Sequence, residues 1–203
     1  MFIVILSYLL LLFPSLEREK EIAYEGSIVL ESKEVLTGTF YFEEKEGLLY
    51  RRKKEGLEIF PVYAVKALYF YDARENINRQ YIKLVSDGSR YPYQLYEVVL
   101  SGEVKVLRKR KSHDYPLKND APELVKAGEH AYNYHYFVLF DDELVGLSDF
   151  SREVFPHMFN QHPQELNYLV EGLDWNVKEA SGAIQLIKKY NQLSKLQAQV
   201  SCF

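Results

Sequence analysis

The chain has 203 residues, of which 47% are hydrophobic and 15% aromatic, and its formal net charge is −4. This length suits one domain with a sizeable core, and so many large apolar side chains exclude a disordered chain. The acidic balance lacks the basic stripe of nucleic-acid-binding proteins, so we expect no nucleic-acid partner. A single cysteine, Cys202, excludes a disulfide scaffold.

The first segment, residues 1–16, is apolar and carries no charge. Its core from Phe2 to Phe13 is shorter than the roughly twenty residues of a membrane-spanning helix, and it matches the apolar region of a secretory signal peptide. No Lys or Arg precedes this core and no small-residue cleavage site follows it, so an uncleaved anchor or a buried strand stays an alternative. We expect an exported protein of the periplasm or the cell surface, with no transmembrane span after signal removal.

Alternation of apolar and polar residues, typical of β-strands, runs from residue 26 to about residue 149. The most regular run, Val62–Tyr71, is apolar on both faces and therefore predicts a central strand with cover on both sides. Residues 109–130 show no period, which predicts a long surface loop. We expect about nine strands, at residues 27–31, 35–43, 47–52, 62–71, 79–85, 93–100, 103–108, 132–140 and 143–147.

After these strands the apolar pattern changes to a helical period. Ser148 caps a first predicted helix, Pro163 begins a second, and Asn176 with Glu179 forms a capping box for a third. The third helix carries one apolar stripe, which needs a partner surface and consists of Ala180, Ala183, Ile184, Ile187 and Tyr190.

The order of these elements predicts an α+β fold. We expect a mainly antiparallel β sandwich or small barrel in residues 17–147, followed by a short C-terminal helical segment in residues 148–203. Because no Gly/Ser-rich linker separates the two parts, the helical tail should pack on or next to the sheet.

The histidines do not have the spacing of a metal site. His130 and His135 are five residues apart, which places their side chains on opposite faces of a strand. His157 and His162 have the same separation, which makes them diverge on a helix. No phosphate-binding loop or dinucleotide fingerprint occurs either, so we expect no metal and no cofactor.

The densest carboxylate cluster, Asp141, Asp142 and Glu143, lies at a predicted turn, with Asp149 nearby. Acidic residues are common at turns, and glycoside hydrolysis needs two carboxylates that face each other across a cleft. No nucleophile motif such as G-x-S-x-G is present. A hydrolase of envelope sugar or lipid that uses Asp141, Asp142 or Asp149 with a neighbouring histidine is the alternative to a binding function.

Two groups of residues are candidates for binding. A basic run could contact a phosphate-bearing lipid or a polysaccharide, or could be a solvated strand end; it consists of Arg108, Lys109, Arg110 and Lys111. Tyr132, Tyr134 and Tyr136 share one face of a predicted strand, as do Tyr69 and Tyr71. Exposed tyrosines of this kind would stack on sugars or on a partner, whereas partly buried ones would line the edge of the core.

Several sequence features occur in the order found in a group of exported proteins. They are the apolar N-terminus, the segment GSIVLESKEVLTGTF, a hairpin from Leu100 to Leu107, the segment from Phe150 to Leu166 and a last helix closing on residues 187–191. In this order the chain resembles a group of exported β-rich proteins, common in Bacteroidota, that have no assigned activity. The chain departs from them at His162, where a Cys or Asp often precedes the proline.

The resemblance implies a location in the cell envelope and a β domain with a helical tail, and it implies no catalytic residue. Because no catalytic set converges in the sequence, we expect a non-enzymatic envelope protein. Its ligand would be an envelope component, such as a glycan or a lipid, or a partner protein.

Overall fold

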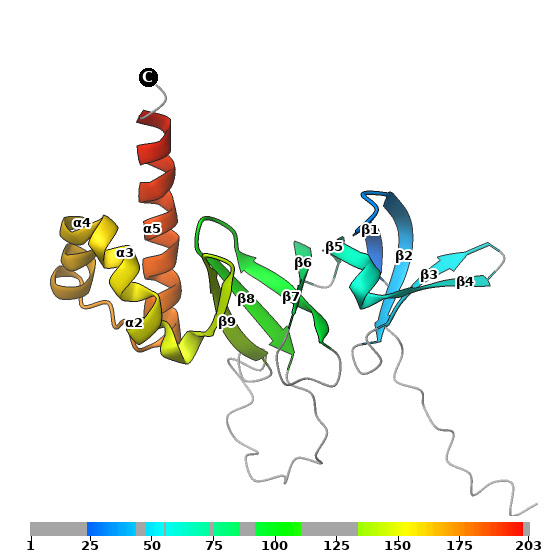
Figure 1. Ribbon diagram of the computed structural model, residues 1–203, viewed down its shortest axis with the longest axis horizontal. Coiled ribbons are helices and arrows are strands. Elements are labelled where there is room, and N and C mark those ends of the chain that lie inside the picture. The colour runs from blue at the N-terminus through cyan, green and yellow to red at the C-terminus, as the bar shows by residue number, and fades with distance from the viewer. Residues whose placement is uncertain are drawn as a thin grey trace, which may run out of the picture.

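The computed structural model of the protein describes residues 24–43, 48–54, 56–73, 75–85, 92–110 and 134–200 (Figure 1). The predicted signal segment 1–16, most of the predicted loop 109–130 and Cys202 lie outside these residues. Within them the chain forms strands first and helices last, and Figure 1 shows the helices gathered at one end of the molecule. The predicted β-rich fold with a C-terminal helical tail is therefore confirmed.

The strands form one antiparallel sheet in the order β10-β9-β8-β7-β6-β5-β1-β2-β3-β4. The sheet is open, so it is neither a pair of packed sheets nor a closed barrel, and it has ten strands where about nine were expected. Its strands are β1 (Tyr24–Leu30), β2 (Val35–Glu43), β3 (Leu48–Lys53), β4 (Gly56–Pro61), β5 (Val65–Asp72), β6 (Ile77–Val85), β7 (Tyr93–Leu100), β8 (Lys105–Arg110), β9 (Tyr134–Phe140) and β10 (Glu143–Gly146).

The additional strand, β4, follows the turn after β3 and forms one edge of the sheet. A short 3₁₀ helix, η2 (Val62–Ala64), then separates β4 from β5, so the predicted strand over 62–71 loses its first three residues. β5 lies in the interior of the strand order, as predicted. The expected cover on both of its faces is wrong, because Tyr69 and Tyr71 are 41% and 49% exposed. A tyrosine ring tolerates this position since its hydroxyl stays in contact with water.

Two apolar clusters lie on the same face of the sheet, at opposite ends. The first is covered by helices and includes Val106 of β8 and Val138 of β9. The second lies over β1, β2 and β5 and includes Ile28 and Phe40. The second cluster also contains Val62 of η2 and Leu95 of β7. Because the sheet twists and coils, η2 lies against β7 and covers this cluster, so no second sheet is needed to bury it.

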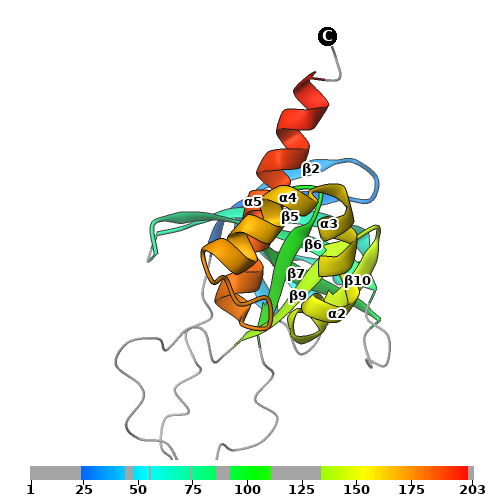
Figure 2. The same ribbon diagram turned by 90° about the vertical axis from the view of Figure 1, so that its left-hand side faces the viewer.

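We call this side of the sheet the helix face and the opposite side the open face. On the open face, a smaller cluster of Tyr96, Leu107 and Leu139 lies over β7, β8 and β9. The rest of the open face, over β1, β2, β5 and β6, carries mainly polar and aromatic side chains, together with the exposed Val35. The two faces therefore differ in composition. The helices of residues 147–200 pack on the helix face, and Figure 2 shows them in front of the strands.

The helical tail begins with η4 (Leu147–Asp149) and contains five helical segments after it. They are α2 (Phe150–Glu153), α3 (Phe155–Gln161), α4 (Pro163–Asn167), the π-helical segment η5 (Tyr168–Gly172) and α5 (Ala180–Val200). Pro156 stands at the start of α3 and splits the first predicted helix in two. The predicted stripe of α5 is confirmed in part, because Ala183, Ile187 and Tyr190 are buried while Ala180 is exposed.

Asn191 of α5 holds the tail onto the hairpin between β7 and β8. Its Oδ1 accepts a hydrogen bond from the backbone N–H of Val104 at 3.0 Å, and its Nδ2 donates to the carbonyl of Val104 at 2.7 Å. Val104 is fully buried. At Gly102, in the turn between β7 and β8, a Cβ would lie 2.3 Å from the Asn191 side chain, so glycine at this position provides the space for the contact.

We expect Asn191→Ala to lower the free energy of unfolding by about 2 kcal/mol, since it leaves two buried backbone groups without partners. Urea denaturation measures this change. Gln192→Ala, an exposed neighbour on the same helix, should change the free energy by no more than about 0.5 kcal/mol. Equal midpoints for the Asn191 variant and the wild type would contradict the proposed attachment of the tail.

Tyr190 forms the second polar contact between α5 and this hairpin. Its hydroxyl donates to the Glu103 carboxylate at 2.8 Å, and its ring is fully buried. Burial, together with the hydrogen bond to Glu103, raises the pKa of Tyr190 from 10.0 to about 12. The contact therefore stabilises the fold only while the phenol is neutral.

A pH series tests this contact. Below pH 10 the phenol is neutral in both states, and between pH 10 and about 12 only the unfolded chain ionises, so stability falls as pH rises through this window. The free-energy difference between the wild type and Tyr190→Phe should shrink over this window, as measured by urea denaturation at each pH. Tyr168→Phe, a change at an exposed tyrosine, is the control. Its free energy of unfolding should have the same pH dependence as that of the wild type.

Candidate functional site

The register of β8 and β9 decides where the predicted basic and tyrosine residues lie. Arg108 pairs with Tyr136, and these two residues share the helix face with Tyr134, whose ring lies beside the Arg108 guanidinium. The backbone of Arg110 pairs with Tyr134. Lys109 points to the open face, where its Nζ donates to the Gln94 side chain of β7. Tyr132 and Lys111 lie outside the described residues. The structure thus brings part of the predicted set together and separates Lys109 from it.

Arg108 is bound to a buried carboxylate of the neighbouring strand β7. Nε of Arg108 donates to Oε2 of Glu97 at 2.7 Å, and Nη2 donates to Oε1 at 2.8 Å. The two side chains therefore form a bidentate ion pair. The guanidinium also lies 4.2 Å from the ring centroid of Tyr134. Glu97 itself is only 5% exposed.

Glu97 also binds Arg79 of β6, through Nη1. The other nitrogens of Arg79 bind Asp72 at 2.8 Å and Glu75 at 2.7 Å. Three carboxylates and two guanidinium groups therefore form one network on the helix face, between the two apolar clusters. The sequence showed no sign of this network, because its members come from four different strands and a turn.

The carboxylates decide the charge state of both arginines. Burial disfavours the charged guanidinium, but the bonds to Asp72 and Glu97 outweigh it and hold the pKa of Arg79 above its ordinary value. The pKa of Arg108 is raised for the same reason, through Glu97. Burial raises the pKa of Tyr81, which lies beside Glu97, far above the ordinary value as well. Arg108 is therefore part of a closed ion pair and would have to leave Glu97 to bind a phosphate.

We expect Glu97→Gln to lower the free energy of unfolding by about 3 kcal/mol, because it leaves two largely buried guanidinium groups short of a carboxylate. Thermal and urea denaturation measure the loss. Glu58→Gln is the matched control, since Glu58 binds Lys53 and Arg51 at a more exposed site, and its loss of stability should be clearly smaller than that of Glu97→Gln. Equal losses in the two variants would show that the buried network contributes no more to stability than a more exposed ion pair.

The other predicted tyrosine pair, Tyr69 and Tyr71 of β5, lies on the open face. Neighbouring strands place polar side chains beside both rings, in two rows that cross the sheet. The first row is Thr37, Ser27, Tyr69 and Gln80, and the second is Thr39, Glu25, Tyr71 and Asn78. We call these two rows the tyrosine surface.

The two rings of the tyrosine surface are held by hydrogen bonds at their hydroxyl groups. Gln80 donates to the hydroxyl of Tyr69 at 3.2 Å, and the hydroxyl of Tyr71 donates to the side chain of Asn76. The second row continues through Arg52 to Leu57 of the edge strand, which is 60% exposed. A flat aromatic area bordered by amides, hydroxyls and one apolar edge is therefore open to solvent.

The predicted catalytic carboxylates lie at the two ends of β10. Asp141 and Asp142 form a two-residue turn with φ of 47° and 64°, which is typical of a type I′ hairpin. Asp149 follows the other end of the strand, after about 13 Å of β10, and its carboxylate binds Arg152 at 2.8 Å. The predicted cluster is therefore divided, with no pair that faces across a cleft.

The described histidines also lie apart. His135 is exposed on β9, His157 packs its ring against Phe140, and His162 is buried with its ring edge-on to Tyr190. In the part of the chain that the structure describes, no group of three His, Cys, Asp or Glu side chains could hold a metal ion. No ion pair among the described residues joins a histidine to Asp141, Asp142 or Asp149.

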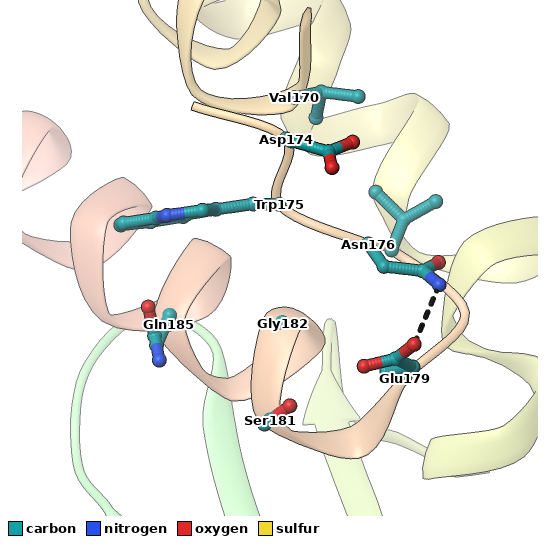
Figure 3. A pocket seen from close by; sticks show the side chains of 9 residues that line it. Val170, Asp174, Trp175, Asn176, Glu179, Ser181, Gly182 and Gln185 are labelled. Carbon is teal, nitrogen blue, oxygen red and sulfur yellow. Dashed lines mark hydrogen bonds between the residues drawn. The ribbon is translucent and has the colours of Figure 1, made fainter. Parts of the chain in front are cut away.

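The helical tail contains a cavity of about 570 Å³ between η5, the following loop and the first turns of α5 (Figure 3). The indole of Trp175 forms one wall. The polar lining includes Asp174, Glu179, Ser181 and Gln185. The sequence contained one signal for this site, the single tryptophan, but its place among helix-flanking polar residues is set by the tertiary structure.

Comparison of the chain with protein-family models, with curated proteins and with solved structures gave no match. None of the helices in residues 134–200 has both the length and the apolar character that crossing a bilayer requires.

Proposed function

We propose that the protein is a non-enzymatic binding protein of the cell envelope, exported to the periplasm or the cell surface, which docks a partner protein through the tyrosine surface. One observation carries this proposal: Tyr69 and Tyr71 stand exposed side by side on a sheet face that no helix of residues 134–200 covers. The expected export signal in residues 1–16 supports the location.

The chemistry of the tyrosine surface suits a flat protein contact. Tyrosine is enriched at the centres of protein interfaces, where a large rigid ring is buried and its hydroxyl keeps a polar partner. Because both hydroxyls are already bound by neighbouring amides, the rings lose little freedom on docking. The exposed Leu57 at the rim of the same face adds apolar area.

The basic run contributes less to such a contact than the sequence alone implies. Arg108 is bound to Glu97, and Lys109 is bound to Gln94. A phosphate-bearing lipid or a polysaccharide would therefore compete with existing bonds at both residues. For this reason we place the docking surface at the tyrosines of β5.

Replacing both rings tests the proposal. The double variant Tyr69→Ala and Tyr71→Ala should lose at least about tenfold of its affinity for a partner captured from envelope extracts, since central tyrosines contribute more than 1 kcal/mol each. Affinity capture followed by titration with the purified partner measures the loss. Unchanged far-UV circular dichroism would show that the variant is folded.

Tyr168→Ala is the matched control, because Tyr168 is 63% exposed in η5, away from the sheet. It should capture the partner like the wild type. If both variants lose the partner equally, or if the double variant binds as well as the wild type, the tyrosine surface is not the docking site. If no partner is captured and glycosidase or esterase substrates are turned over instead, the hydrolase alternative replaces the proposal.

A further inference from the structure

We infer that the cavity beside Trp175 binds a neutral saccharide, with one sugar ring packed against the indole. This site belongs to the helical tail, and it does not depend on the tyrosine surface or on the partner proposed for it. Its volume of about 570 Å³ lies within the range of roughly 300–1,000 Å³ that ligand pockets span. There is therefore room for at least one pyranose ring.

The wall of this cavity is fixed before a ligand arrives. The backbone N–H of Trp175 donates to the carbonyl of Leu169 at 3.2 Å, and part of the Trp175 side chain packs against the helix-covered core. Asp174, just before it, has φ of 53°, a left-handed conformation that turns the chain at this point. The indole is thus held in place and lines the cavity (Figure 3).

The loop and α5 approach each other closely at the base of the cavity. A Cβ on Gly182 would lie 2.1 Å from the carbonyl oxygen of Asn176, so only glycine allows this approach. The Asn176 side chain accepts a hydrogen bond from the N–H of Lys178 and donates one to Glu179, each at 2.9 Å. The predicted capping box is therefore wrong in its bonds: the two side chains bind each other, the N–H of Glu179 donates to the backbone carbonyl of Asn176, and α5 begins at Ala180.

The charges around the cavity favour a neutral ligand. The carboxylates of Asp174 and Glu179 repel an anion. The N-terminus of α5 lies at the same place and carries about half a positive charge, which disfavours a cation. Hydroxyl groups satisfy both demands, because they donate to carboxylates and accept from amide or backbone N–H groups.

The indole distinguishes a sugar from other neutral polyols. A pyranose ring has one face of C–H groups that can cover an aromatic surface, while its hydroxyls point outward toward the rim. The rim here offers carboxylates from Asp174 and Glu179, the amide of Gln185 and the hydroxyl of Ser181. The adjoining η5 is a π-helical segment, a local irregularity that is frequent at functional sites.

The fluorescence of Trp175 gives a direct assay, because it is the single tryptophan of the chain. The full-length protein is titrated with four neutral sugars, namely glucose, galactose, mannose and N-acetylglucosamine. At least one should produce a saturable change with a dissociation constant on the order of 1 mM or below. Glucuronate and glucosamine, the charged analogues of glucose, and the open-chain polyol sorbitol should each bind at least about tenfold more weakly than the best sugar, a factor that corresponds to 1.4 kcal/mol.

Three variants test whether the fluorescence change arises from binding in the cavity. Gln185→Ala should weaken the best sugar at least about fivefold while it retains the tryptophan, and Gln192→Ala, an exposed residue of α5 outside the cavity, should bind like the wild type. Asp174→Asn, which keeps a residue that tolerates positive φ, should reduce the discrimination against glucuronate. Circular dichroism checks that each variant is folded.

The outcomes separate the possible ligand classes. If no neutral sugar gives a saturable change up to its solubility limit, the inference is wrong. Tighter binding of glucosamine or of glucuronate than of any neutral sugar would also overturn it and would assign the cavity to a cation or an anion. These results leave the partner capture by the tyrosine surface unaffected, so the two proposals fail or succeed separately.

Discussion

The carboxylate of Glu97 is the group on which the arrangement of the sheet depends. It lies on β7 and binds Arg79 of β6 on one side and Arg108 of β8 on the other. A shift of one residue in either strand pair would turn one of these side chains to the opposite face. A buried charge without its partner is costly, so the network selects one register for three adjacent strands.

The position of this network explains why the protein has two apolar clusters on one sheet face. The helices cover one end of that face, and η2 covers the other. Between the two clusters, the charged network takes the place of apolar contacts. The cost of burying these charges is offset because each one is paired with an opposite charge. Because both covers lie on the same side, the open face keeps a large area in solvent. The proposed docking surface and the proposed sugar site both use parts of the molecule that the core leaves free.

The sequence predicted well what depends on local chemistry. The alternation of apolar residues located most strands, Asp141 and Asp142 formed the expected turn, and Pro163 began a helix as expected. The edge strand β4 was missed, because its short run after a charged turn resembled the loop on either side. The sequence also could not show which face of the sheet is covered. The alternation of residues in β5 is the same whether Tyr69 and Tyr71 face a second layer or water.

The candidate sites were harder to predict for a related reason. The basic run from Arg108 has the composition of a binding patch, but its neighbours in space come from β6 and β7, which lie at other positions along the chain. Only the register shows that Arg108 already has a carboxylate. In the same way, Trp175 becomes a candidate only when the loop before α5 is placed against that helix.

The strand order has a consequence for how the chain folds. Every neighbouring pair in the sheet joins strands that follow each other in sequence, except β1 with β5, which pairs Glu25 with Tyr71. The hairpins can form from local contacts, but the two halves of the sheet join only when this long loop closes. Glycine at position 26 allows the backbone of β5 to approach, since a Cβ there would lie 2.1 Å from the carbonyl oxygen of Tyr69. The tyrosine surface crosses this same junction, so it exists only in chains that have completed the slowest pairing of the sheet.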